Sequence, residues 1–171
     1  MTSLEPREGT CGCIVPGDNP EVVIKKVWKR ANAWRRIHSH RAPIQCVIQS
    51  WAHKLCRPEN GFNMLWVPRA WDCSKHQYRM LRIDDSKMLS QDDIDSDIKL
   101  QDDLKLLYAA GFKSGYYPID FELYRQPDGS VAMVDFDKFG WWREDGAVKF
   151  PWTNEWDSKA AAYYRVVDIS E

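Results

Sequence analysis

The feature that most constrains the fold of this chain is an apolar stripe on one side of a predicted helix, with apolar and aromatic segments before and after it in the sequence. The stripe has the spacing of an amphipathic helix and consists of Ile44, Val47, Ile48, Trp51, Ala52 and Leu55. Pro43 precedes it and a Pro/Gly-containing stretch at 58–61 follows it, so a helix is predicted over 44–55. Strands are predicted on both sides of this helix, over 21–27, 64–67 and 77–83.

The second half of the chain continues the alternation of helix and strand. A capping-box spacing begins at Ser90, and the helical stripe over 100–108 is predicted to end at Gly111. A Pro-Asp-Gly turn signal at 127–129 precedes a predicted strand over 131–136, and a short hairpin that carries acidic residues is predicted here. The fold class is therefore predicted to be α+β.

Length and composition indicate a single globular domain. The chain has 171 residues, of which 44% are hydrophobic and 13% aromatic, so a sizeable core is expected and a disordered chain is excluded. No apolar stretch reaches the roughly 18 residues of a membrane span. The segment 1–9 contains no apolar leader, so no secretory signal is expected and the predicted location is the cytoplasm.

Charge is divided unevenly between the two halves of the chain. Residues 1–80 contain 13 Lys/Arg and 6 Asp/Glu, whereas residues 81–171 contain 11 and 19, which gives +7 and −8 within a net charge of −1. Two differently solvated faces are the simplest explanation of this division. A cleft with one basic and one acidic wall, as phosphate and metal chemistry requires, is the alternative.

The chain has an odd number of cysteines with irregular spacing. The five are Cys11, Cys13, Cys46, Cys56 and Cys73. Together with the missing leader, this argues against a disulfide framework and predicts small, half-buried thiols in a reducing compartment. No Cys or His spacing fits a structural zinc site.

Several short segments combine residue types that phosphoryl transfer requires. Gly9–Gly12 can form a loop whose backbone N–H groups approach phosphates without a Cβ clash. Lys25 ends the run Val-Val-Ile-Lys, from which its ammonium group can reach phosphate oxygens. Asp120 and Asp135 lie in the second half, and Asp135 follows an apolar strand, where its carboxylate could hold a divalent cation.

In their order, these segments resemble the protein kinase pattern of a Gly-rich loop, a lysine strand, a catalytic-loop Asp and a D-F-G Asp. The resemblance covers about residues 5–140 and implies ATP and Mg²⁺ as cofactors. It implies one minimal kinase-like domain over 1–171, with a β-rich N-lobe over about 1–83 and a truncated, mainly helical C-lobe over about 88–171.

The resemblance also implies a role for individual residues. The implied catalytic residues are Asp120, which orients the substrate hydroxyl, and Lys25, which orients the phosphates. The implied nucleotide contacts are Gly9, Thr10, Gly12, Val15, Lys25, Arg82 and Asp84, with 84–87 as the hinge over the adenine. The implied metal ligands are Asp135, Glu122 and Asp137.

The chain departs from the kinase pattern at several of its polar positions. Arg125 stands where a second metal ligand, an Asn, is expected, and Glu122 or Gln126 is the candidate substitute. The predicted helix over 44–55 offers Gln45 and Gln49 on its polar face and no Glu that could pair with the lysine. These substitutions make a pseudokinase, which keeps the fold without the activity, the alternative prediction.

The segment after the metal-binding Asp is short. Only 36 residues follow Asp135, which leaves no room for an activation segment or the usual lower-lobe helices. In this respect the chain resembles the minimal kinases of some bacterial type III secretion effectors and large DNA viruses. The resemblance implies a host protein, such as a chaperone or a signalling factor, as substrate, and the host cytoplasm as the place of action.

The sequence therefore predicts a minimal ATP/Mg²⁺-dependent kinase that transfers the γ-phosphoryl group to Ser/Thr of a protein. The alternative is a catalytically inactive pseudokinase scaffold that binds a protein partner. A third interpretation is a nucleic-acid-binding module that uses the basic, Trp-containing stretch 25–41. A solvated helix face explains that stretch more simply, so nucleic acid is not an expected partner.

Overall fold

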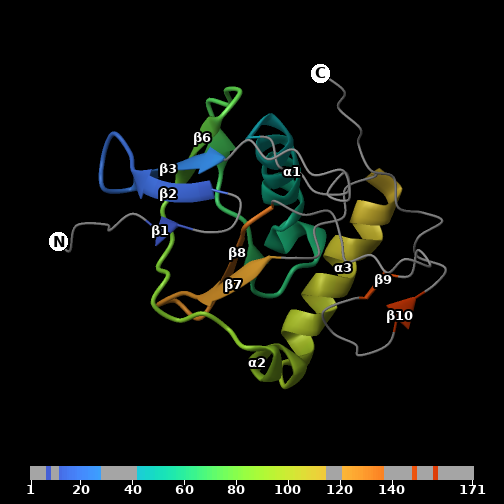
Figure 1. Ribbon diagram of the computed structural model, residues 1–171. Coiled ribbons are helices and arrows are strands. Elements are labelled where there is room, and N and C mark those ends of the chain that lie inside the picture. The colour runs from blue at the N-terminus through green and yellow to red at the C-terminus, as the bar shows by residue number, and fades with distance from the viewer. Residues whose placement is uncertain are drawn as a thin grey trace.

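The first layer of the molecule is a five-stranded antiparallel sheet with the strand order β1-β2-β3-β6-β5 (Figure 1). A computed structural model describes residues 7–8, 12–27, 42–114, 121–136, 148–149 and 156–157 of the chain. The strands are β1 (Arg7–Glu8), β2 (Gly12–Pro16), β3 (Val22–Val27), β6 (Gln77–Leu81) and β5 (Ala70–Trp71). The strands predicted over 21–27 and 77–83 are confirmed as β3 and β6, whereas β5 was not predicted.

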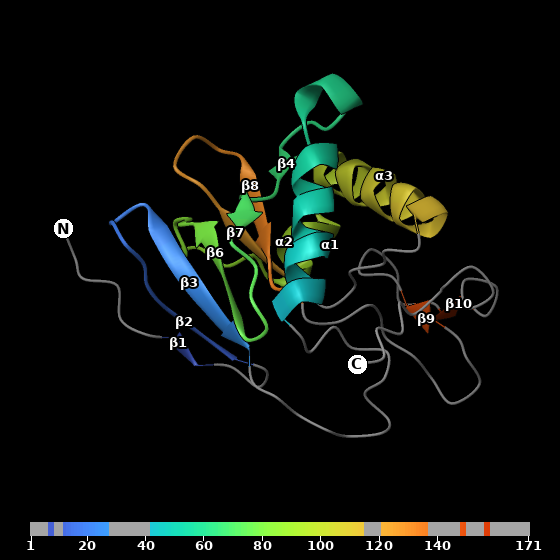
Figure 2. The same ribbon diagram turned by 90° about the horizontal axis from the view of Figure 1, so that it is seen from above.

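Helix α1 (Ala42–Leu55) packs on this sheet, where it contacts β3, β5 and β6. Figure 2 shows α1 standing between the five-stranded sheet and the helix α3 (Ile98–Ser114). The predicted helix over 44–55 is confirmed, and Ile48 and Ala52 of its stripe are buried. Because α1 has neighbours on two sides, its buried face is wider than the stripe alone predicts.

The prediction that Gln45 and Gln49 lie on a polar face of this helix is wrong, because both side chains are fully buried. The amide of Gln49 is hydrogen bonded on both of its ends. Its Nε2 donates to the carbonyl oxygen of Pro68 at 3.0 Å, and its Oε1 accepts from the hydroxyl of Tyr78 at 3.1 Å. A buried amide with such partners fixes the position of α1 against β6.

The second layer is a three-stranded sheet with the order β4-β8-β7. Strand β4 (Leu65–Trp66) runs parallel to β8 (Val131–Val134), and β8 forms an antiparallel hairpin with β7 (Glu122–Arg125). The hairpin turns at Gly129, whose φ of 87° favours glycine. The predicted strand over 131–136 is confirmed over its first four residues, and the predicted hairpin is confirmed, with β7 as the strand for which no residue range was predicted.

The connection after β6 runs along β7 like an additional short strand. The N–H of Leu89 donates to the carbonyl of Leu123 at 2.8 Å, and the N–H of Arg125 donates to the carbonyl of Lys87 at 2.9 Å. Met88 forms an isolated antiparallel bridge with Tyr124. The chain therefore passes from the first sheet to the second through a segment that is hydrogen bonded to the β7–β8 hairpin.

Helices α2 (Gln91–Asp95) and α3 follow this connection, and the predicted capping box at the start of α2 is confirmed. The N–H of Ser90 donates to the Asp93 carboxylate at 2.8 Å, and the N–H of Asp93 donates to the Ser90 hydroxyl oxygen at 3.2 Å. The prediction that the second helix ends at Gly111 is wrong, because α3 continues through this buried residue. Packing against the core outweighs the low helix propensity of a single glycine.

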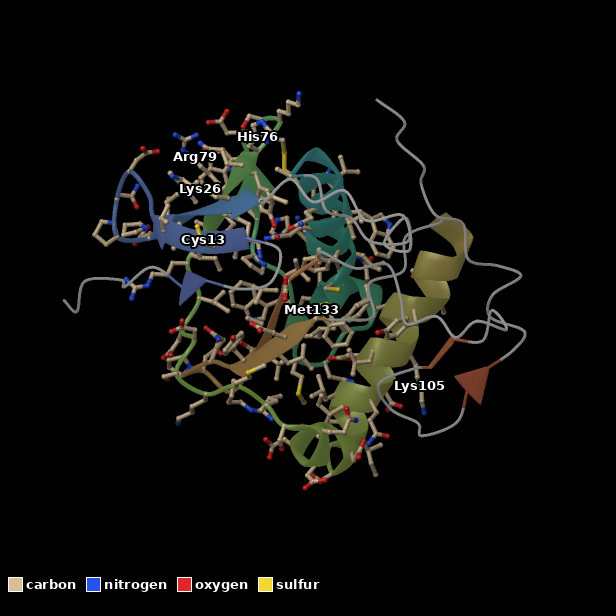
Figure 3. All side chains as sticks on the ribbon, in the orientation of Figure 1. Cys13, Lys26, His76, Arg79, Lys105 and Met133 are labelled. Atoms are coloured by element: carbon tan, nitrogen blue, oxygen red, sulfur yellow. A yellow bond between two sulfur atoms is a disulfide. The ribbon has the colours of Figure 1, made fainter. Side chains whose placement is uncertain are left out.

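Two apolar clusters form the core, and both use residues of α1 and of the β7–β8 hairpin. The upper cluster lies against the first sheet and includes Val23, Val27, Tyr78, Tyr124 and Val134. The lower cluster joins α1, α3 and the second sheet and includes Leu104, Leu107, Leu123, Met133 and Phe136. Met133 lies in the centre of the molecule, whereas Lys105 lies on the outer face of α3 (Figure 3). The hairpin therefore separates the two clusters.

The prediction that all five cysteines are thiols is wrong, because Cys46 and Cys73 form a disulfide. Their Cα atoms are 6.3 Å apart, within the usual range for a disulfide, and the bond links α1 to the connection between β5 and β6. Cys13 and Cys56 are free and buried. Burial raises the pKa of the Cys56 thiol well above its ordinary value, and the nearby Asp103 adds to the shift.

Three short elements complete the described chain. They are a 3₁₀ turn at Pro58–Asn60 and the strands β9 (Val148–Lys149) and β10 (Trp156–Asp157), which pair with each other. Taken together, the helices and the mainly antiparallel sheets confirm the predicted α+β class. No helix in the described part of the chain has both the length and the apolar character needed to cross a membrane.

Candidate functional site

An ion pair joins the two layers at the centre of the candidate site. The ammonium nitrogen of Lys25 lies 3.4 Å from the Oδ1 of Asp135, although 110 residues separate the two in sequence. Lys25 lies two residues from both Val23 and Val27 along β3, so its side chain is on the same face of the strand as these two residues of the upper cluster. It therefore points inward from the first sheet. Its side chain is 12% exposed and that of Asp135 is 28% exposed, so the pair is partly shielded from water.

Asp135 has an unusual backbone conformation. It follows the last residue of β8 and has a φ of 76°, in the left-handed region that few non-glycine residues occupy. Asp tolerates this region better than most residues, but such backbone strain is found preferentially at functional sites. The backbone at the end of β8 therefore supports Asp135 as a functional residue.

Glu122 lies close to this pair through the register of the hairpin. It is opposite Val134 in the β7–β8 ladder, one residue before Asp135. Its Oε2 accepts a hydrogen bond of 2.6 Å from the hydroxyl of Tyr124, which is buried in the upper cluster. Sequence reasoning missed Tyr124, because the alternation that places it beside Glu122 belongs to a strand for which no residue range was predicted.

The backbone of Asp84, the predicted hinge residue, is held by a side-chain amide. Gln126 accepts from the N–H of Asp84 at 3.0 Å and donates to its carbonyl oxygen at 2.9 Å, so both main-chain groups have partners. The Asp84 carboxylate accepts from the hydroxyl and N–H of Ser86, and these bonds lower the pKa of that exposed carboxyl. Gln126, suggested as a metal or substrate contact, thus anchors the backbone of Asp84.

The register of the first sheet shows which of the predicted nucleotide contacts lie on the same face as Lys25. Ile14 is paired with Lys25 and joins the upper cluster, whereas Val15 is paired with Ile24, whose side chain points to the other face. The structure therefore does not bring Val15 to the ion pair, and Ile14 occupies the corresponding inward position. The N–H of Arg82 donates to the carbonyl oxygen of Glu21 at 2.8 Å, at the end of the ladder between β3 and β6.

Arg125 lies on the opposite face of the hairpin from Glu122 and Tyr124. Its guanidinium group donates to the carbonyl of Gly129 at 2.9 Å and lies 3.5 Å from the Asp97 carboxylate. It also lines a separate surface cavity of about 590 Å³, whose described lining residues include neither Lys25 nor Asp135. Arg125 therefore does not take part in the site that contains the ion pair.

The position of β8 depends on a buried carboxylate in α3. Asp103 is fully buried and accepts four hydrogen bonds of 2.7–3.1 Å, from the backbone N–H groups of Asn63, Met64 and Leu65 and from the Asn63 amide. These bonds hold the segment that becomes β4, and β4 in turn pairs with β8. Asp103 therefore supports, at a distance, the strand that presents Asp135.

The donor set fits a magnesium ion only in part. Mg²⁺ is usually held by one or two carboxylates together with substrate phosphates, and Asp135 offers one such carboxylate at the site. Glu122 could offer a second if Tyr124 released it. No group of three or more His, Cys, Asp or Glu side chains that could hold a metal is present among the residues that the structure describes.

Four of the predicted site residues lie outside the described residues: Gly9, Thr10, Asp120 and Asp137. Gly12 is described as the first residue of β2, where it pairs with Val27. The functional roles assigned to all the site residues remain predictions. Comparison of the chain with family models, curated proteins and solved structures finds no significant match in any of the three.

Proposed function

We propose that this chain is a minimal kinase-like phosphotransferase that uses ATP and Mg²⁺ to phosphorylate Ser/Thr of a protein. The observation that carries the proposal is the ion pair between Lys25 and Asp135. The kinase resemblance assigns these two residues to the phosphates and to the metal, respectively, and their charged groups lie side by side. A lysine placed inside an apolar sheet face needs such a partner, and a phosphate group could replace the carboxylate.

The order of elements supports the same proposal. A hairpin (β1–β2) precedes the lysine strand, a helix follows it, and two further strands complete the first sheet. The β7–β8 hairpin then ends at Asp135, where the resemblance expects the D-F-G position. A kinase-like arrangement of this kind places the nucleotide between the first sheet and the hairpin.

In the proposed reaction, the oxygen of a substrate hydroxyl attacks the γ-phosphorus of ATP. The bond from this phosphorus to the β–γ bridging oxygen breaks, ADP leaves, and the hydroxyl proton passes to the carboxylate of Asp120. Lys25 neutralises and orients phosphate oxygens, and Asp135 would hold Mg²⁺, which neutralises further charge on the phosphates. Catalysis in this scheme consists mainly of positioning and electrostatic stabilisation.

The pseudokinase alternative is favoured by the Tyr124–Glu122 hydrogen bond, which occupies a candidate metal ligand.

Incubation with γ-labelled ATP, Mg²⁺ and a cell extract distinguishes an active kinase from a pseudokinase. A kinase transfers label to protein, and the transfer is lost in Asp135→Asn, which tolerates the same backbone conformation. The control is Asp128→Asn, in the exposed hairpin turn. Label transfer equal in wild type and Asp135→Asn, or no transfer at all, would contradict catalysis by this site.

A further inference from the structure

Tyr124 occupies the layer between the first sheet and the β7–β8 hairpin. Its side chain is 3% exposed and belongs to the upper cluster, together with Val23 of β3, Val134 of β8 and the partly buried Ile14 and Ile83. The neighbouring residues of the hairpin, Leu123 and Met133, belong instead to the lower cluster. Tyr124 therefore projects into the same layer as Lys25.

The tyrosine ring is held in this layer from two directions. Its backbone is bridged to Met88 of the inter-sheet connection, and its hydroxyl donates to Glu122 at 2.6 Å. Hydrogen bonds from a hydroxyl to a carboxylate are short and stronger than those between neutral groups. The same bond occupies the carboxylate of Glu122, whose partner in the β7–β8 ladder is Val134, the residue before Asp135.

We infer that Tyr124 determines which nucleotide base the site admits, an inference that rests on the proposed function. A nucleotide whose phosphates reach Lys25 and Asp135 needs an apolar surface for its base. The apolar side chains on the face of β3 that carries Lys25 belong to the upper cluster, and the tyrosine ring is buried within the same cluster. A base therefore enters only when the ring turns away and its bond to Glu122 breaks.

This arrangement makes nucleotide binding depend on a conformational equilibrium. If only a fraction of molecules has the ring turned away, the apparent Kd is raised by the inverse of that fraction. Breaking the bond between the ring hydroxyl and the carboxylate also frees Glu122 beside Asp135. The movement that admits the base then also makes the carboxylate of Glu122 available as a second metal ligand.

Titration calorimetry with Mg·ATP and Mg·CTP on Tyr124 variants of the full chain tests this inference. In Tyr124→Phe the ring loses its hydrogen bond to a charged group, so ATP should bind about tenfold more tightly than to wild type. Tyr124→Leu also removes the ring, and its gain should be larger for ATP than for CTP because a purine needs more space. Tyr108→Phe, in the lower cluster, is the matched control and should bind like wild type.

The outcomes separate this inference from the proposed function. If wild type and both Tyr124 variants bind ATP equally tightly, and Lys25→Met abolishes that binding, the inference is overturned while the proposed site stands. An equal gain for ATP and CTP in Tyr124→Leu also overturns it. If no variant binds nucleotide in a Lys25-dependent way, the proposed function itself fails. Thermal unfolding of each variant establishes beforehand that it is folded. If Tyr124→Leu does not fold, Tyr124→Phe, which keeps the buried ring, still tests the inference.

Discussion

The ammonium nitrogen of Lys25, in the basic half of the sequence, lies 3.4 Å from the Oδ1 of Asp135, in the acidic half, across the two layers of the molecule. The first sheet supplies the lysine from its inward face, and a strained residue at the end of β8 supplies the carboxylate. This ion pair therefore joins the basic half of the sequence to the acidic half, whereas the pairs of Arg79 with Asp18 and of Arg125 with Asp97 each form within one half.

The first prediction concerns the coupling between these two residues. Asp135→Asn leaves the Lys25 ammonium without this carboxylate and should cost about 1–2 kcal/mol of unfolding free energy, between the values for exposed and buried pairs. Lys25→Met/Asp135→Asn should cost clearly less than the two single changes together, as measured by urea unfolding in a double-mutant cycle. Lys26→Met, at the neighbouring exposed position, is the control. Additive costs would mean that the pair has no energetic coupling.

The second prediction concerns the buried carboxylate of α3. Asp103→Ala leaves three backbone N–H groups and one amide without their acceptor, and each such loss costs roughly 1–3 kcal/mol. We expect a loss of at least about 3 kcal/mol in urea unfolding and greatly reduced protection of the Met64 and Leu65 amides in hydrogen exchange. Asp102→Ala, on the exposed side of the same helix, should change stability by less than about 0.5 kcal/mol. Comparable effects of the two changes would rule out the anchoring role.

The elements that sequence patterns predicted correctly are those with a strong local signal. The apolar stripe predicted α1, the run of valines predicted β3, and the Ser90–Asp93 spacing predicted the capping box. Strand β7 has no comparable signal, because its alternation of Glu122, Leu123, Tyr124 and Arg125 serves two differently packed faces. The end of α3 was mispredicted because its buried Gly111 is stabilised by packing, which local propensity does not contain.

The candidate site was predictable only as an order of motifs. That order indicated that Lys25 and Asp135 belong together, and the structure brings them into contact. The hydrogen bond between Tyr124 and Glu122 depends on strand register, and so does the choice of Ile14 over Val15 as the inward residue. A register is set by the pairing of distant strands, so inspection of one strand alone does not reveal it.

The third prediction concerns the disulfide between Cys46 and Cys73. The bond closes a loop with a sequence separation of 27. Cys73→Ser should therefore cost about 3.5 kcal/mol by the loop-entropy relation, and a dithiol reductant should lower the stability of wild type but not of this variant. Cys46 is fully buried, so Cys73, whose side chain is exposed, is the better position to change.

Cys13→Ser or Cys56→Ser would be a poor control for the disulfide, because both thiols are buried. Lys75→Ala is the matched control, since it changes an exposed side chain two residues from Cys73 without touching the disulfide. Mass spectrometry of an unreduced digest should find the peptides of Cys46 and Cys73 linked. Two free thiols at these positions in protein purified without reductant would contradict the pairing.

The last prediction concerns the titration of Asp93 in the capping box of α2. The N–H of Ser90 and then its hydroxyl hold the pKa of the Asp93 carboxyl below its usual value of about 4. Because the folded-state pKa is the lower one, the stabilisation is present above the unfolded-state value and is lost as the pH falls through the folded-state value. Carboxyl-carbon NMR should therefore show a lower pKa for Asp93 than for the aspartate of a model peptide.

Ser90→Ala removes the hydroxyl but keeps the backbone N–H, which is the larger cause of the shift. The pKa of Asp93 should therefore return only part of the way to its usual value. An unchanged titration in Ser90→Ala would show that the hydroxyl does not contribute, and a titration equal to that of the model peptide in wild type would contradict the capping box itself.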